Sequence, residues 1–203
     1  MIKITDSEEY LLNHYASSEL AGGLILGRRA RVEEDINLVK NLLRHSKEEI
    51  DHSYRWYKLI KTLNARVILQ KDVRGDHFFR YVRVLDFLIV FFCAVLIFEH
   101  RVAFHFNCHR EWTKITEIQD LLEELIEEEE KHLGWIEEYL KNLIKISDKT
   151  ILPKIIKAEN AEKENYLKEL SIIEKNEELR GLYKVIKDKL IGFEKEYRWW
   201  KKI

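Results

Sequence analysis

The segment Leu121–Leu143, LLEELIEEEEKHLGWIEEYLKNL, is the stretch from which the fold can be predicted. Its apolar residues recur three and four positions apart, which is the spacing of one face of an α-helix. That face holds, in order, Leu122, Leu125, Glu129, His132, Ile136, Tyr139 and Leu143. A carboxylate and an imidazole, one turn apart, therefore replace two hydrophobic residues on the side expected to be buried.

Glu129 and His132 form a Glu-x-x-His motif, which puts both side chains next to each other on the helix. This arrangement holds metal ions inside helix bundles. One copy carries little weight in a chain with 35% charged residues. The remaining acids of the segment fall off the apolar face and are expected in solvent: Glu123, Glu124, Glu127, Glu128 and Glu130.

A second copy of the motif lies 80 residues earlier, where Glu49 and His52 align with Glu129 and His132. The same shift aligns Glu19 with Glu99. Further identities or close matches at this offset are Leu42 with Leu122, Ile60 with Leu140, Lys61 with Lys141, and Leu63 with Leu143. Each half thus has one Glu followed thirty residues later by Glu-x-x-His, which predicts an internal repeat of a two-helix unit.

Composition predicts an all-α fold. The chain has 203 residues, 46% of them hydrophobic, with one Pro and seven Gly, so it contains few residues that break helices. The net charge is −1 and the sequence pI is near 6.7. No excess of basic residues points to a nucleic acid or to an anionic membrane, and we expect neither as a partner.

Several features predict a cytoplasmic protein. The N-terminal residues MIKITDSEEY are polar, where a secretory signal would need an apolar core. Cys93 and Cys108 form no Cys-x-x-Cys motif, which fits a reducing compartment. The most apolar run, Phe87–Phe98, has 12 residues, fewer than the roughly 18 to 20 that cross a bilayer, so we interpret it as a buried core helix.

The pattern predicts four long helices followed by a helical hairpin. Residues 1–146 are expected to form a four-helix bundle with a long crossover, 64–76, between the second and third helices. Residues 147–203 are expected to form a C-terminal two-helix hairpin that covers the third helix, with Leu167, Leu170 and Ile173 on the inward face of its first helix. The expected helices are approximately 5–29, 32–63, 77–109, 113–146, 152–175 and 178–201.

Two further features concern the environment of the acids. Glu99 ends the most apolar run, so its carboxylate must be paired, protonated or metal-bound, because burial of an isolated charge costs several kcal/mol. Gly22 and Gly23 weaken a helix, and we interpret them as a close helix contact or as space beside a site.

The candidate metal ligands are Glu19, Glu49, His52, Glu99, Glu129 and His132. One carboxylate from each of two helices and a Glu-x-x-His from each of the other two suit two iron or manganese ions, with Glu49 and Glu129 as bridging ligands.

Tyr15 and His45, each one turn before a candidate ligand, are candidate catalytic residues. His45 either donates a hydrogen bond to a metal ligand, or is an extra ligand, or is a hydrogen-bonded core residue. His105, Cys108 and His109 have spacing that could suit zinc, but they lack a fourth ligand and do not share a helical face.

With these residues over about 6–146, the chain resembles the ferritin-like superfamily of di-iron carboxylate proteins, which includes bacterioferritin, rubrerythrin, and the di-iron oxygenases and oxidases. The resemblance rests on Glu19, Glu49-Ile50-Asp51-His52, Glu99 and Glu129-Glu130-Lys131-His132. It implies two iron ions, or one manganese and one iron, that react with O2 or peroxide.

Among functions within this superfamily, the sequence favours an oxygenase or oxidase that acts on a small or apolar organic substrate. Such an enzyme also needs an electron donor, which the sequence does not identify, and a homodimer is plausible. A rubrerythrin-like peroxidase is the next alternative, although the chain lacks a Cys-rich rubredoxin module. A ferritin-type ferroxidase that stores iron is the third alternative. A different class altogether is a non-enzymatic helical scaffold or binding module, in which the Glu and His residues form buried salt bridges.

Overall fold

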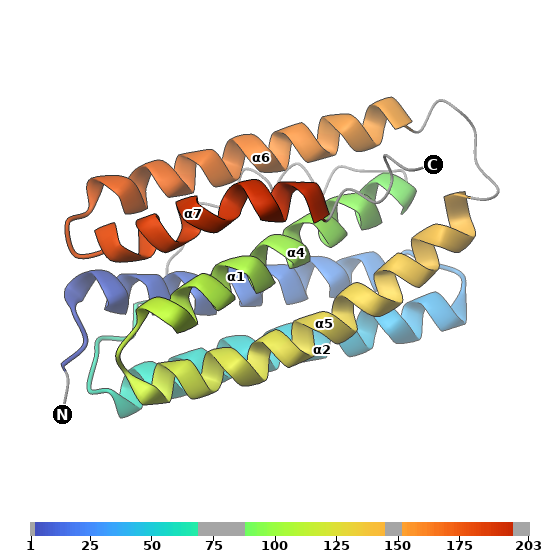
Figure 1. Cartoon of the computed structure of the whole chain (residues 1–203). Helices are drawn as coiled ribbons and strands as arrows, with labels where there is room; N and C mark the ends of the chain where they lie inside the picture. The colour runs from blue at the N-terminus through green and yellow to red at the C-terminus, as the bar shows by residue number, and fades with distance from the viewer. Residues whose placement is uncertain (1–2, 69–87, 145–151, 197–203) are drawn as a thin grey trace. The chain divides into compact units, whose positions relative to one another are not determined.

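The computed structural model describes residues 3–68, 88–144 and 152–196 (Figure 1). Over these residues the protein is all-helical, as predicted. The helices are α1 (Asp6–Ala30), α2 (Ile36–Thr62), α4 (Leu88–Trp112), α5 (Thr116–Ile144), α6 (Leu152–Lys175) and α7 (Arg180–Glu196).

The helix starts follow the capping residues in the sequence. The Thr5 side chain accepts a hydrogen bond from the Glu8 backbone N–H at 3.1 Å, which confirms the predicted cap of α1. In α2 the Asp35 carboxylate caps the Asn37 N–H at 2.9 Å, so this helix begins about four residues later than predicted. The predicted start of the third helix and its cap at Gly75 and Asp76 lie outside the described residues.

The chain divides into two compact units, residues 1–83 and 84–203. In the first unit α1 packs along α2. In the second unit α4 packs against α5, α6 and α7, and α6 packs against α7 (Figure 1). The four-helix bundle and the domain boundary between residues 146 and 147 stay predictions.

The α1–α2 pair is held at short range by two serines of α2. Ser46 and Ser53 each donate a hydrogen bond from the side-chain hydroxyl to a backbone carbonyl of α1, those of Gly23 and Ala16, both at 2.6 Å. A Cβ atom on Gly23 would lie 2.8 Å from the Ser46 carbonyl oxygen. The close helix contact expected at this glycine is therefore present.

In the second unit α4 is buried against neighbours on several sides. The Phe92 ring meets the rings of Trp135 and Tyr139 of α5 edge-on, with centroids 5.5 and 4.9 Å away. On another side the Arg101 guanidinium lies 4.0 Å from the centroid of the Tyr166 ring of α6. An apolar helix such as α4 needs this covering, because it has no polar face to present to water.

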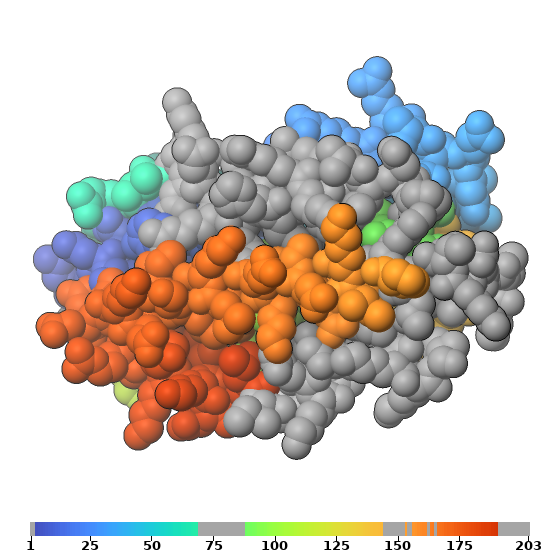
Figure 2. Space-filling model, turned by 90° about the horizontal axis from the view of Figure 1, so that it is seen from above, coloured from blue at the N-terminus to red at the C-terminus, as the bar shows by residue number. Residues whose placement is uncertain are grey.

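The inward face of α6 differs by one residue from the prediction. Leu167 was expected to face the core with Leu170 and Ile173, but it is 49% exposed, whereas Tyr166 is 2% exposed. The stacking of Arg101 on Tyr166 selects the tyrosine for the inward position. The outer surface that α6 and α7 present is visible in Figure 2.

Helix α4 is long and apolar enough to cross a membrane when judged by length and composition alone. Of its most apolar 18-residue window, 61% is buried inside the structure. A buried core helix passes the same test, so this property alone is weak evidence for a membrane span.

The close α1–α2 contact predicts opposite effects for two glycine-to-alanine substitutions. Gly23→Ala should lower the free energy of unfolding by about 1–3 kcal/mol, because the added methyl meets the Ser46 backbone carbonyl oxygen, which cannot move aside, and side-chain carbons of Ile50 and Glu49. Gly134→Ala should raise it by about 1 kcal/mol, because within the described part of the chain the added methyl meets no other side chain or helix within 4 Å, and alanine favours the helix. Denaturant unfolding followed by circular dichroism measures both, and equal gains would contradict the close contact.

Candidate functional site

All six candidate ligands are buried. Their exposed fractions are 5% for Glu19, 2% for Glu49, 0% for His52, 3% for Glu99, 0% for Glu129 and 1% for His132. The acids expected to face solvent do so, except that Glu128 is half-buried. The periodicity therefore separated the buried acids from the exposed ones within a single run of glutamates.

Burial follows the sequence repeat closely. The sequence of buried, half-buried and exposed positions over residues 41–60 recurs over 121–140, with Ser53 and Leu133 as the one difference. Because side-chain burial is set by how a helix is packed, the two segments present corresponding faces to their surroundings. The 80-residue repeat is thus a repeat of structure as well as of residue type.

In the first unit, Glu19 of α1 and Glu49 and His52 of α2 form the first half-site. A ligand atom from each lies within 4.8 Å of the other two. The His52 Nδ1 atom is 3.8 Å from Glu19 Oε2 and 3.9 Å from Glu49 Oε1. Ligands about 2.1 Å from one ion are roughly 3 to 4 Å apart, so these separations suit a metal ion.

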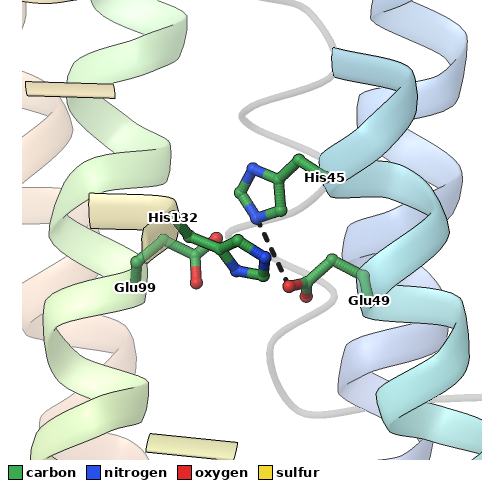
Figure 3. A group of neighbouring side chains, drawn as sticks. All are labelled: His45, Glu49, Glu99 and His132. Atoms are coloured by element: carbon green, nitrogen blue, oxygen red, sulfur yellow. Dashed lines mark ion pairs between the residues drawn. The ribbon is translucent and has the colours of Figure 1, made fainter. Parts of the chain in front are cut away.

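In the second unit, Glu99 of α4 and Glu129 and His132 of α5 form the second half-site. His132 Nδ1 is hydrogen-bonded to Glu129 Oε2 at 3.1 Å. A carboxylate oxygen of Glu99 and a ring nitrogen of His132 lie within 4.8 Å of each other (Figure 3). Each helix pair therefore brings together its own glutamate and its own Glu-x-x-His motif.

The two candidate catalytic residues both lie in the first unit. His45, which is fully buried, forms an ion pair with Glu49, with 3.3 Å between Nε2 and Oε1 (Figure 3). The Tyr15 ring is buried and lies 5.3 Å from the ring of Trp56, one turn beyond His52. The catalytic role of Tyr15 and His45 stays a prediction.

The donor chemistry of these residues fits a metal ion. Buried Glu and His side chains form groups that could hold one. Carboxylate oxygen and imidazole nitrogen are the donors that iron and manganese accept in proteins. A cation also offsets the free energy of burying carboxylates, which is otherwise several kcal/mol for each charge. An all-helical protein with such groups is compatible with a ferritin-like fold.

Gly22 leaves space beside the Glu49 carboxylate, which is one of the two roles that the sequence suggests for this glycine pair. A Cβ atom at this position would lie 3.1 Å from Glu49 Oε2. Its neighbour Gly23 instead faces the backbone of α2. The two adjacent glycines thus have different roles, one in helix packing and one beside a ligand.

Sequence reasoning missed the two serines that hold α1 to α2. Each serine directly follows a histidine of α2, in His45-Ser46 and His52-Ser53, and this is the signal that could have found them. Because their hydroxyls bond to α1 carbonyls, they fix the rotation of α2 and with it the direction of both imidazoles.

The alternative zinc ligands are not brought together. His105, Cys108 and His109 are buried, but among the described residues they do not belong to a group that could hold a metal ion. Burial raises the pKa of the Cys108 thiol to about 12, and that of Cys93 to the same value. Both cysteines are free and suit hydrophobic packing better than metal binding.

Comparison of the chain with protein-family models, with curated proteins and with solved structures found no significant match.

The position of Gly22 predicts that stability and metal binding respond differently to one methyl group. Gly22→Ala should leave the free energy of unfolding unchanged or raise it by up to about 1 kcal/mol, because only a flexible carboxylate must move. Metal affinity should fall, because the displaced carboxylate is that of Glu49. Denaturant unfolding of the metal-free protein and titration with Fe(II) measure the two effects. Unchanged metal affinity would show that this space is irrelevant to the site.

The raised pKa values predict that both thiols are unreactive in the folded protein. With a pKa of about 12, roughly one thiol in ten thousand is ionised at pH 8, and the thiolate is the reactive form. A disulfide reagent that releases a coloured thiol should label neither Cys93 nor Cys108 until denaturant is added. Rapid labelling of the native protein would contradict the burial of these residues.

Proposed function

We propose that the protein is a di-metal carboxylate oxidoreductase of the ferritin-like type, with two iron ions or one manganese and one iron. One observation carries the proposal. Each of two helix pairs assembles, in a buried position, one glutamate from the first helix with a Glu-x-x-His motif from the second. A repeat that preserves these three donors twice is typical of the bundles that hold two ions.

The proposal assigns one role to all six ligands. In the proposed bundle of α1, α2, α4 and α5, Glu19 and His52 belong to one ion, and Glu99 and His132 belong to the other. Glu49 and Glu129 would be ligands shared by the two ions. The negative charges of four carboxylates equal the positive charges of two divalent ions, which supports a pair of ions over a single one.

Two ferrous ions held there would supply the electrons that reduce O2 or peroxide. The chain contributes the surroundings of the centre. The buried α4 residues before Glu99, among them Phe92, Ala94 and Val95, exclude water on the second unit's side. Trp56, fully buried, does so beside His52. Tyr15, one turn before Glu19 on α1, would donate a hydrogen bond or a proton near that ligand.

The apolar character of these surroundings supports a small or apolar organic substrate, hence an oxygenase or oxidase. A polar substrate would have to give up its hydration on entering such surroundings without gaining hydrogen bonds in return. A peroxidase, or a ferroxidase that stores iron, would use the same six ligands. These proteins would differ from an oxygenase in which molecule enters the metal centre and reacts there. The proposal therefore concerns first the metal centre and second the substrate.

The proposal predicts about two iron ions per chain after anaerobic reconstitution with Fe(II), measured by elemental analysis. Addition of O2 should then change the visible absorption and consume oxygen. Glu129→Ala should lose at least one ion, because it removes a bridging ligand. Glu130→Ala, its exposed neighbour, is the matched control and should keep both ions.

Two results would count against this function. If the wild-type protein binds no metal, the Glu and His residues form buried salt bridges and the protein is a helical scaffold. If Glu129→Ala and Glu130→Ala lose metal equally, the assignment of ligands by helix face is wrong. Circular dichroism of each metal-free variant shows whether it still folds.

A further inference from the structure

The repeat is broken at one polar position next to the candidate ligands. One turn before its Glu-x-x-His motif, the first unit has His45, whereas the second unit has Leu125. Both residues are fully buried, so the same place on the two helices holds an imidazole once and an alkyl group once. An imidazole buried in a metal-binding region at a position where the fold accepts leucine needs an explanation other than packing.

The contacts of the two bridging candidates differ accordingly. In the first unit Glu49 Oε1 is 3.3 Å from His45 Nε2 and 3.9 Å from His52 Nδ1. In the second unit Glu129 Oε2 is 3.1 Å from Nδ1 of its own motif histidine, His132. Glu49 therefore has a histidine on each side along the helix, and Glu129 has one.

The two histidines of α2 cannot serve the same ion. They are seven residues apart, and a helix rises about 10 Å over that length. His52 lies on the side of Glu49 where Glu19 completes the first half-site. His45 lies one turn away on the other side of Glu49. This argument rests on the proposed function, in which Glu49 bridges two ions.

We propose that His45 is a seventh metal ligand, which makes the two ions of the centre unequal. His52 binds the ion that Glu19 holds, so His45 binds the other ion, the one assigned to Glu99 and His132. That ion then has five protein ligands, while the ion of Glu19 and His52 has four. The ion with fewer protein ligands keeps more open coordination positions for O2 and substrate.

Calorimetric titration of the full-length protein with Fe(II) under anaerobic conditions tests this inference. The wild type should bind two ions, the first at least about 10-fold more tightly than the second, because five ligands hold it. His45→Leu, which installs the residue that the repeat has at 125, should weaken the tighter ion about 10- to 100-fold. His45→Gln should weaken it similarly, since an amide can pair with Glu49 but is a poor ligand.

Matched variants of the two halves identify which ion is which. Glu99→Ala should weaken the tighter ion, and Glu19→Ala should weaken the other one. Leu125→His should strengthen the weaker ion, because it adds an imidazole on the opposite side of Glu129. This variant keeps the inference testable if His45→Leu fails to fold, which circular dichroism of the metal-free protein would show.

The outcomes separate this inference from the proposed function. Weaker binding of the tighter ion in both His45→Leu and Glu99→Ala supports both proposals. If the wild type binds two ions and His45→Leu binds them as the wild type does, His45 is not a ligand, and the di-metal function stands. If His45→Gln restores wild-type affinity, His45 only positions Glu49. If the wild type binds no ion, both proposals fail.

Discussion

The burial of four carboxylates inside an all-helical protein is the constraint on which the rest of the structure depends. Each buried charge without a partner costs several kcal/mol, which is comparable to a large part of the stability of a domain. The structure meets part of this cost with imidazoles, as in the pairs His45 with Glu49 and His132 with Glu129. Metal ions held by these groups, as proposed, would offset it further, and this would explain why the acids and histidines occur together.

The same constraint explains how tightly the first helix pair is held. A half-site works only if its donors keep their positions, and α2 must therefore keep its rotation against α1. Ser46 and Ser53 achieve this with hydroxyl-to-carbonyl hydrogen bonds, and Gly23 allows the backbones to approach. The second pair uses aromatic contacts instead, with Phe92 packed against Trp135 and Tyr139.

Much of the fold and of the donor set could be predicted, because helical periodicity determines which residues are buried. This is why Glu129 could be told apart from the exposed Glu130 beside it. Other features depend on contacts between helices, which periodicity does not contain. The choice of Tyr166 over Leu167 as the inward residue of α6 depends on Arg101 of α4. Likewise, the different roles of Gly22 and Gly23 depend on which atoms of α2 face them.

The departures from the repeat are as informative as the repeat itself. Duplication of a two-helix unit gives two equal halves, and any chemistry that needs two unequal metal ions must come from later differences between them. The halves differ beside the candidate ligands. In the 80-residue repeat, His45 aligns with Leu125, Tyr15 with Val95 and Trp56 with Ile136. All three polar or aromatic residues lie in the first unit, and all are buried. In the proposed metal centre, the donors that the repeat preserves would hold the two ions, and the differences between the halves would determine what each ion can do.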